Sequence, residues 1–179
     1  ITLFSSHLQA GNTIGVTNLR TEYKTNPTGI GVASPRFSWE IQSSGKDIRQ
    51  TAWQIRAAAT EKELKAGKNL LWDTGKVYSD KSIQIPYQGL PLNSRDKVYW
   101  QVRITTNQGQ TAWSKVASLE VGLLSSSDWI ASWIQPDVPE DNSTAPPVPY
   151  MRKEFLLKSH IAKARIYASA QGIYQLKLN

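Results

Sequence analysis

Short apolar runs that alternate with turn signals constrain this chain more than any other feature. The runs recur about every ten residues, a spacing typical of an antiparallel β-sandwich. The breaks between them carry Gly, Pro, Asn and Ser, which favour turn dihedrals or lack a donor for a sheet ladder. We therefore predict an all-β fold. The predicted strands are Val16–Tyr23, Arg36–Ile41, Ala52–Ala58, Leu70–Lys76, Ser82–Pro86, Val98–Thr106 and Thr111–Val121.

The run Val98–Thr106 has the clearest alternation. Its apolar set is Val98, Trp100, Val102 and Ile104, and its polar set is Tyr99, Gln101, Arg103 and Thr105. Because successive side chains of a strand point to opposite faces, the apolar set is predicted to face a core. Trp100 is then a central packing residue of the sandwich.

The same parity argument sorts the other aromatic side chains. Trp39 and Trp53 alternate with apolar neighbours and are predicted to face inward. For four other tryptophans the pattern does not decide between a place in the core and a place on the surface. They are Trp72, Trp113, Trp129 and Trp133. The better candidates for a solvent-exposed surface, on which a sugar ring stacks, are Tyr78, Tyr87 and Tyr99.

One segment has the signature of a helix. Thr60 is followed three residues later by Glu63, and Gly67 ends the segment. This is a capping box with a C-terminal glycine. Because Leu64 is its lone large apolar residue, we predict one or two helical turns lying on the surface.

The composition changes after Gly122. A polar junction is followed by a proline-rich stretch at 137–149, and the pair Trp129 and Trp133 between them fits a short strand or a helical turn. Alternation then returns in three predicted strands, which are Met151–Leu157, Ala164–Ala170 and Gly172–Leu178. Three strands cannot close a core unaided, so we predict the truncated start of a second domain.

Charge and composition narrow the function classes. The net charge is +7, but the cations are scattered, with no run longer than Arg152-Lys153. Phosphate binding needs clustered cations, so we predict no nucleic-acid partner. No apolar stretch approaches the length of a membrane span. With no cysteine in the chain, thiol catalysis, disulfides and thiolate metal sites are excluded.

The inventory of reactive side chains is thin. His7 and His160 have no partner at a spacing known from catalytic sites. The carboxylates are dispersed over turns, a helix cap and strand ends, as in Glu61, Glu63, Asp73, Asp80 and Asp96. Glycosidase chemistry needs two carboxyl groups that meet across a cleft. We predict no catalytic, cofactor-binding or metal-binding residue in this chain, and no cofactor.

The N-terminal residues Ile1–Ala10 resemble the end of a secretory signal followed by a small-residue cleavage site. An ordinary frayed tail explains them equally well. The first alternative predicts a periplasmic or extracellular protein.

A series of ordered motifs carries a resemblance to a known family. The series is NLRTEY (18–23), NPTGI (26–30), SPRFSWE (34–40), QTAWQIRAA (50–58), LWDTGKVYS (71–79), VYWQVR (98–103), AWS (112–114), VGLL (121–124), DWIASWI (128–134), YMRKEF (150–155) and ARIYASAQGIYQLKLN (164–179). In this order they resemble the amino-terminal region of bacterial α-L-rhamnosidases of glycoside hydrolase family 78. The resemblance covers nearly all of the chain from Val16 to Asn179.

The resemblance implies a fibronectin type III or immunoglobulin-like sandwich followed by the first strands of a jelly-roll-like sandwich. The expected divisions are a tail at 1–15, the sandwich at 16–122, a junction at 123–149 and a truncated second sandwich at 150–179. The tyrosine corner of such sandwiches is not evident, and Trp100 is a candidate to take its place.

For function, the resemblance implies a non-catalytic accessory part of an enzyme that releases terminal L-rhamnose by inverting hydrolysis. In that family the catalytic carboxylates lie in a helical barrel further along. The implied partners are the remaining domains of the polypeptide and, through the whole enzyme, rhamnose-containing glycans. The alternative from another class is a stand-alone carbohydrate-binding or protein-interaction module.

Overall fold

The computed structural model describes residues 13–137, 148–156, 160–161 and 163–178, and these form two units, Ile1–Ala131 and Ser132–Asn179. The N-terminal residues up to 12, which include His7 and the possible signal remnant, lie outside the described part. Each unit is considered by itself.

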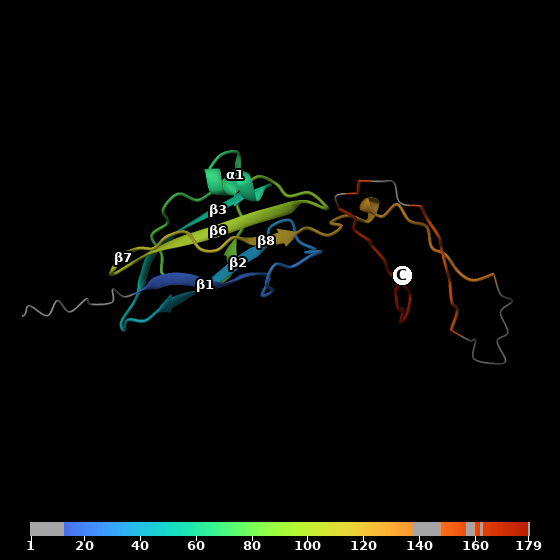
Figure 1. The fold of residues 1–179 in the computed structure, drawn as a ribbon, viewed down its shortest axis with the longest axis horizontal. Helices are drawn as coiled ribbons and strands as arrows, with labels where there is room; N and C mark the ends of the chain where they lie inside the picture. The colour runs from blue at the N-terminus through green and yellow to red at the C-terminus, as the bar shows by residue number, and fades with distance from the viewer. Residues whose placement is uncertain (1–12, 138–147, 157–159, 162, 179) are drawn as a thin grey trace, which may run out of the picture. The chain divides into compact units, whose positions relative to one another are not determined.

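Two antiparallel sheets make up the first unit (Figure 1). The three-stranded sheet has the order β1 (Ile14–Thr21), β2 (Arg36–Ser43) and β5 (Ile85–Pro86). The five-stranded sheet has the order β4 (Leu70–Asp73), β3 (Gln50–Ala58), β6 (Lys97–Thr106) and β7 (Gly109–Gln110), and β8 (Ala117–Glu120) also pairs with β6. The predicted all-β sandwich is confirmed.

The pairing of β3 with β6 fixes which side chains face the core. Ile55 lies opposite Val102, and Arg56 lies opposite Gln101. Ile55 and Val102 are fully buried. The alternation predicted for β6 is therefore confirmed, and its polar set lies on the outer face of the five-stranded sheet.

Aromatic rings fill the space between the two sheets. The Phe37 ring from β2 lies with its centroid 4.4 Å from that of Trp100 on β6. Trp39 and Trp53 meet edge to face at 5.8 Å, which confirms that both face inward. Trp72, whose position the sequence left open, also belongs to this core. Trp100 does not replace a corner tyrosine, because its buried indole N–H has no hydrogen-bond partner among the described residues.

The predicted helix is confirmed as α1 (Glu61–Ala66). The Thr60 hydroxyl accepts a hydrogen bond from the Glu63 N–H, and Gly67 ends the helix in the left-handed region with φ of 63°. The helix lies against β3 and β6 (Figure 1). Leu64 is fully buried, so this single side chain anchors an otherwise exposed helix.

Three strands are shorter than predicted, and one example shows why. The run Thr111–Val121 forms a strand only as β8, although its first half also lies along β6. There the β6 N–H groups of Ile104 and Val102 donate to the hydroxyls of Thr111 and Ser114 rather than to carbonyls. Side-chain acceptors thus interrupt the ladder. Similarly, Leu70–Lys76 ends as a strand at Asp73, and Ser82–Pro86 is reduced to β5.

The described residues of the tail contain no strand, contrary to the three predicted over Met151–Leu157, Ala164–Ala170 and Gly172–Leu178. A strand is stable only when a neighbour satisfies its backbone groups and a second layer covers its apolar face. Large apolar side chains of this segment are instead exposed, with Leu156 and Ile173 fully so. The pair Trp129 and Trp133 follows a short 3-10 turn, η1 (Ser126–Asp128), and forms neither a strand nor a helix.

Candidate functional site

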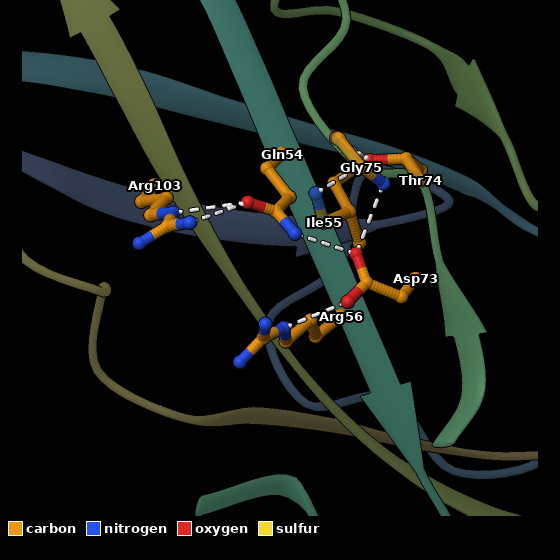
Figure 2. Close-up of polar contacts among 7 residues, drawn as sticks. All are labelled: Gln54, Ile55, Arg56, Asp73, Thr74, Gly75 and Arg103. Atoms are coloured by element: carbon orange, nitrogen blue, oxygen red, sulfur yellow. Dashed lines mark hydrogen bonds and ion pairs between the residues drawn. The ribbon is translucent and has the colours of Figure 1, made fainter. Parts of the chain in front are cut away.

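A polar network covers the outer face of β3, β4 and β6 (Figure 2). Its centre is the Gln54 amide, whose Oε1 accepts hydrogen bonds from Arg103 Nε and Nη2 at 3.0 and 2.7 Å. The amide nitrogen donates to Asp73 Oδ1 at 2.6 Å. Asp73 Oδ2 in turn accepts from Arg56 Nε at 2.9 Å. One buried glutamine thus connects two arginines and a carboxylate across three strands.

Asp73 is also tied to the turn that follows β4. Its Oδ1 accepts a hydrogen bond from the Gly75 N–H at 3.0 Å, and the neighbouring Thr74 hydroxyl accepts from the Ile55 N–H (Figure 2). Burial by itself raises the pKa of a carboxyl, but the donors Gln54, Gly75 and Arg56, with the arginine's charge, hold the pKa of Asp73 below its ordinary value of 3.8.

Trp113 completes the network from the segment before β8. The guanidinium carbons of Arg56 and Arg103 lie 4.8 and 4.6 Å from its ring centroid, within the range of cation–π attraction. The half-buried ring therefore covers both arginine side chains. Because every member is partnered, this network stabilises the sheet face rather than forming a reactive centre.

The lowered pKa of Asp73 predicts a pH-dependent contribution to stability. An ionised group with a lowered folded-state pKa stabilises the fold above its unfolded pKa and loses that contribution as the pH falls through the folded value. We expect the free energy of unfolding to fall more steeply in the native chain than in Asp73→Asn, from about pH 5 to about pH 2. Chemical denaturation of both chains across this pH range measures the difference in their free energies of unfolding.

Asp80→Asn is the matched control, because Asp80 is exposed and makes no polar contact with described residues. This control is expected to follow the native pH profile. Parallel curves for the native chain and Asp73→Asn would contradict the assignment.

The other acidic residues singled out in the sequence have structural contacts. Glu61 pairs with Lys65 at 2.5 Å, and the Glu63 carboxylate accepts hydrogen bonds from the Thr60 hydroxyl at 2.7 Å and the Asn69 amide at 3.2 Å. Asp96 accepts from the Asn93 N–H at 2.7 Å within a turn. Among the described residues, no group of three or more His, Asp or Glu side chains is arranged to hold a metal ion. His160 is exposed in the tail.

The three tyrosines named as surface candidates differ in their exposure. Tyr78 is exposed, and Tyr99 is half-buried on the outer face of β6. The prediction for Tyr87 is wrong, because it is buried between the sheets and its hydroxyl donates to the Leu90 carbonyl at 2.8 Å. Burial, with the nearby charge of Asp96, raises the pKa of Tyr87 to about 12.

The polar junction after Gly122 is fastened to the sandwich. The Asp128 carboxylate accepts hydrogen bonds from the Ser94 hydroxyl at 2.5 Å and from the Ser125 N–H at 2.9 Å. The Ser94 oxygen also accepts from the Leu124 N–H, and the Leu124 side chain packs on the core. Residues 123–128 are therefore an ordered extension of the sandwich rather than a free linker.

Two aromatic residues follow residues 123–128 in the chain. Trp129 is 43% exposed and Trp133 is 69% exposed. With Trp113 half-buried and Trp72 in the core, the four tryptophans left open by the sequence have three kinds of environment: one is buried, one is half-buried and two are exposed.

The geometry defines a class of protein, an immunoglobulin-like β-sandwich. The polar side chains of its outer network are bonded to one another, and none of the contacts described above pairs a catalytic acid with a catalytic base. Comparison with known proteins agrees. Residues 16–125 match the model of the Rha78A-like, N-terminal immunoglobulin domain. The chain belongs to this family.

Similar proteins extend the match beyond the first unit. The chain is 36% identical over 161 residues to an α-L-rhamnosidase of Alteromonas sp. (strain LOR), and 39% identical over 162 residues to one of Formosa agariphila. Each match covers 86% of this chain but 17% of the relative. The chain thus spans about a sixth of the length of these relatives.

A solved structure shows the same fold. The crystal structure of Streptomyces avermitilis α-L-rhamnosidase complexed with L-rhamnose superposes with a TM-score of 0.65 at 38% identity. It covers 69% of this chain, and this chain covers 12% of it. The chain therefore corresponds to the accessory N-terminal part of much larger proteins. No helix in the described residues is long and apolar enough to cross a membrane.

Proposed function

We propose that this chain is the non-catalytic N-terminal accessory part of an α-L-rhamnosidase, an enzyme that releases terminal L-rhamnose from glycans. The match of residues 16–125 to the N-terminal immunoglobulin domain carries the proposal. The contacts of the acidic side chains support it, because they bond the helix-capping threonine, close a turn or join the outer network. The sandwich then serves to pack against and position the other domains of the same polypeptide.

A hydrolysis assay of this chain tests the proposal. Inverting hydrolysis needs two carboxyl groups about 6.5–9.5 Å apart with room for water between them. We expect residues 1–179 to hydrolyse an aryl α-L-rhamnoside no faster than buffer. A polypeptide carrying these residues ahead of the remainder of a rhamnosidase is expected to hydrolyse it. Release of the aryl alcohol, followed by its absorbance, measures both.

A positive result needs one control. Turnover by the purified chain that disappears in Asp73→Asn or another single carboxylate variant would contradict the non-catalytic assignment. Turnover that survives every such variant would instead identify a contaminating glycosidase, and repeated purification would remove it.

We also propose that residues 150–179 begin a second β-sandwich, after the sandwich at 16–122 and a junction at 123–149. The exposed apolar side chains support this. They recur through the tail at Tyr150, Phe155, Ile166 and Leu176, which a complete domain would bury. Hydrogen exchange is expected to be fast at these residues in the 179-residue chain and slowed in a longer polypeptide. Equal exchange rates would oppose the proposal.

We propose a periplasmic or extracellular location, on the resemblance of Ile1–Ala10 to the end of a secretory signal. N-terminal sequencing of the protein recovered from its native host tests this. A mature N-terminus close to residue 11 would support export, and retention of Ile1–Ala10 would oppose it.

A further inference from the structure

The chain leaves the sandwich through a segment that is bonded to the turn before β6. The Asp128 carboxylate accepts hydrogen bonds from the Ser94 hydroxyl at 2.5 Å and from the Ser125 N–H at 2.9 Å. The Arg95 guanidinium donates from Nη2 to the Asp128 carbonyl oxygen at 2.9 Å. We call Ser94, Arg95 and Asp128 the exit clasp. Its bonds hold both the side chain and the backbone of the residue that precedes Trp129.

The backbone of Arg95 adopts a conformation that is costly for a residue with a side chain. Its φ is 73°, in the left-handed region that glycine adopts freely and arginine rarely. In this conformation the Arg95 N–H donates to the carbonyl oxygens of Val121 and Gly122, at 3.2 and 3.1 Å. Glycine would make the same turn without the cost. The arginine side chain therefore needs a role of its own, and its bond to the Asp128 carbonyl supplies one.

The segment between β8 and the exit clasp is attached to the sandwich along its length. The Leu124 N–H donates to the Ser94 hydroxyl oxygen at 2.8 Å, and the Leu124 side chain packs on the core. Gly122 approaches Gly29 so closely that a Cβ atom added to it would lie 3.2 Å from the Gly29 carbonyl carbon. The exit clasp extends this attachment to Asp128.

The position of these bonds matters because consecutive domains move relative to one another unless their connection is stiff. A single hydrogen bond would leave the chain free to turn about it. The exit clasp instead bonds the carboxylate and the carbonyl of one residue to two neighbouring residues of the same turn. Rotation about either bond alone is then opposed by the other.

We propose that the exit clasp fixes the direction in which the chain leaves the sandwich, which makes the sandwich a rigid mount for the polypeptide that follows. Arg95 and Asp128 are then positioning residues. This role rests on the proposed function of the chain as a positioning module, but the rigidity of the exit can be measured without any enzyme activity.

Pulsed electron paramagnetic resonance between two spin labels tests the proposal in the 179-residue chain. The chain has no cysteine, so labels attach only at the two introduced residues, Gln42→Cys on β2 and Ile130→Cys just past the exit clasp. Both positions are exposed. We expect a single narrow distribution of distances in the otherwise native chain. In Arg95→Gly and in Asp128→Ala, the narrow peak is expected to be lost to a broad distribution.

Thermal unfolding separates this role from that of an ordinary stabilising contact. Arg95→Gly removes one hydrogen bond but also relieves the cost of the left-handed backbone, so its unfolding temperature is expected to change little. Loss of the narrow distance peak without loss of stability is the result expected of a positioning residue. A large fall in the unfolding temperature of Arg95→Gly would contradict that role.

Asp47→Gly is the matched control, because Asp47 is exposed and also has a positive φ, of 58°, but does not belong to the exit clasp. It is expected to keep the narrow distribution. A broad distribution in the native chain, or a narrow one in both clasp variants, would overturn the proposal. If Asp128→Ala fails to fold, Arg95→Gly alone decides. Hydrolysis of a rhamnoside by the chain would refute the proposed function and leave these distances unchanged.

Discussion

Replacement of Trp100 by alanine is expected to lower the free energy of unfolding by about 3–5 kcal/mol, the usual cost of deleting a buried aromatic side chain. Trp100 has no exposed surface, and its ring packs 4.4 Å from that of Phe37 across the two sheets. The cavity would open at the centre of β6, where both flanking strands hold the backbone in place and limit collapse. Denaturant unfolding followed by circular dichroism measures the change.

Two further variants separate this packing effect from others. Trp100→Phe keeps most of the ring contact and removes an indole N–H that has no partner among the residues the structure describes, so it is expected to cost clearly less than alanine. Trp129→Ala removes an equal side chain from a site that is 43% exposed and is expected to change stability little. Equal losses in Trp100→Ala and Trp129→Ala would refute the central role of Trp100.

Local patterns predicted the parts of this fold that local physics determines. The period-two alternation of Val98–Thr106 identified its buried face correctly, because one residue of slip would expose the whole apolar set. The capping box at Thr60 and Gly67 identified α1, since both ends of a short helix are set by neighbouring residues. These signals need no knowledge of the tertiary structure.

Predictions failed where a distant contact decides the outcome. Tyr87 follows Pro86 in a stretch with no period, and it is buried because Phe37 and Trp72 pack against it from two other strands. The tail has the alternation of strands, yet the described part of it forms none, because alternation supplies neither a pairing partner nor a covering layer.

The candidate site was only partly visible in the sequence. Parity placed Gln101 and Arg103 on the outer face, but the contact of Gln54 with Arg103 depends on the register between β3 and β6. The sequence did contain an indication of this face, because two strands carry the same pattern of a glutamine and an arginine two residues apart: Gln54 with Arg56, and Gln101 with Arg103. Pairing these two runs as neighbours would have predicted a polar outer face, but not the individual hydrogen bonds across it.

Gly89→Ala is expected to destabilise the sandwich by about 1–3 kcal/mol, through crowding rather than backbone strain. A Cβ atom at this position would lie 2.5 Å from the Leu71 carbonyl oxygen and 2.6 Å from both Trp72 Cβ and the Tyr87 hydroxyl. The first of these atoms belongs to the backbone of β4 and the second is attached to it, so neither can move without disturbing the edge of the five-stranded sheet. The Leu90 N–H donates to the same Leu71 carbonyl, which is expected to lose this bond.

The matched control for crowding is Gly31→Ala, because a Cβ there meets no atom within 4 Å and the backbone is not in the left-handed region. This variant is expected to be neutral or slightly stabilising, since alanine restricts the unfolded chain. Adding Tyr87→Phe to Gly89→Ala removes one of the three crowded atoms, yet the Leu71 and Trp72 contacts remain, so stability is not expected to return. Urea unfolding of the four chains decides the point: if Gly89→Ala unfolds at the same urea concentration as Gly31→Ala, the loop has room for a side chain and the close approach at Gly89 is not required by the fold.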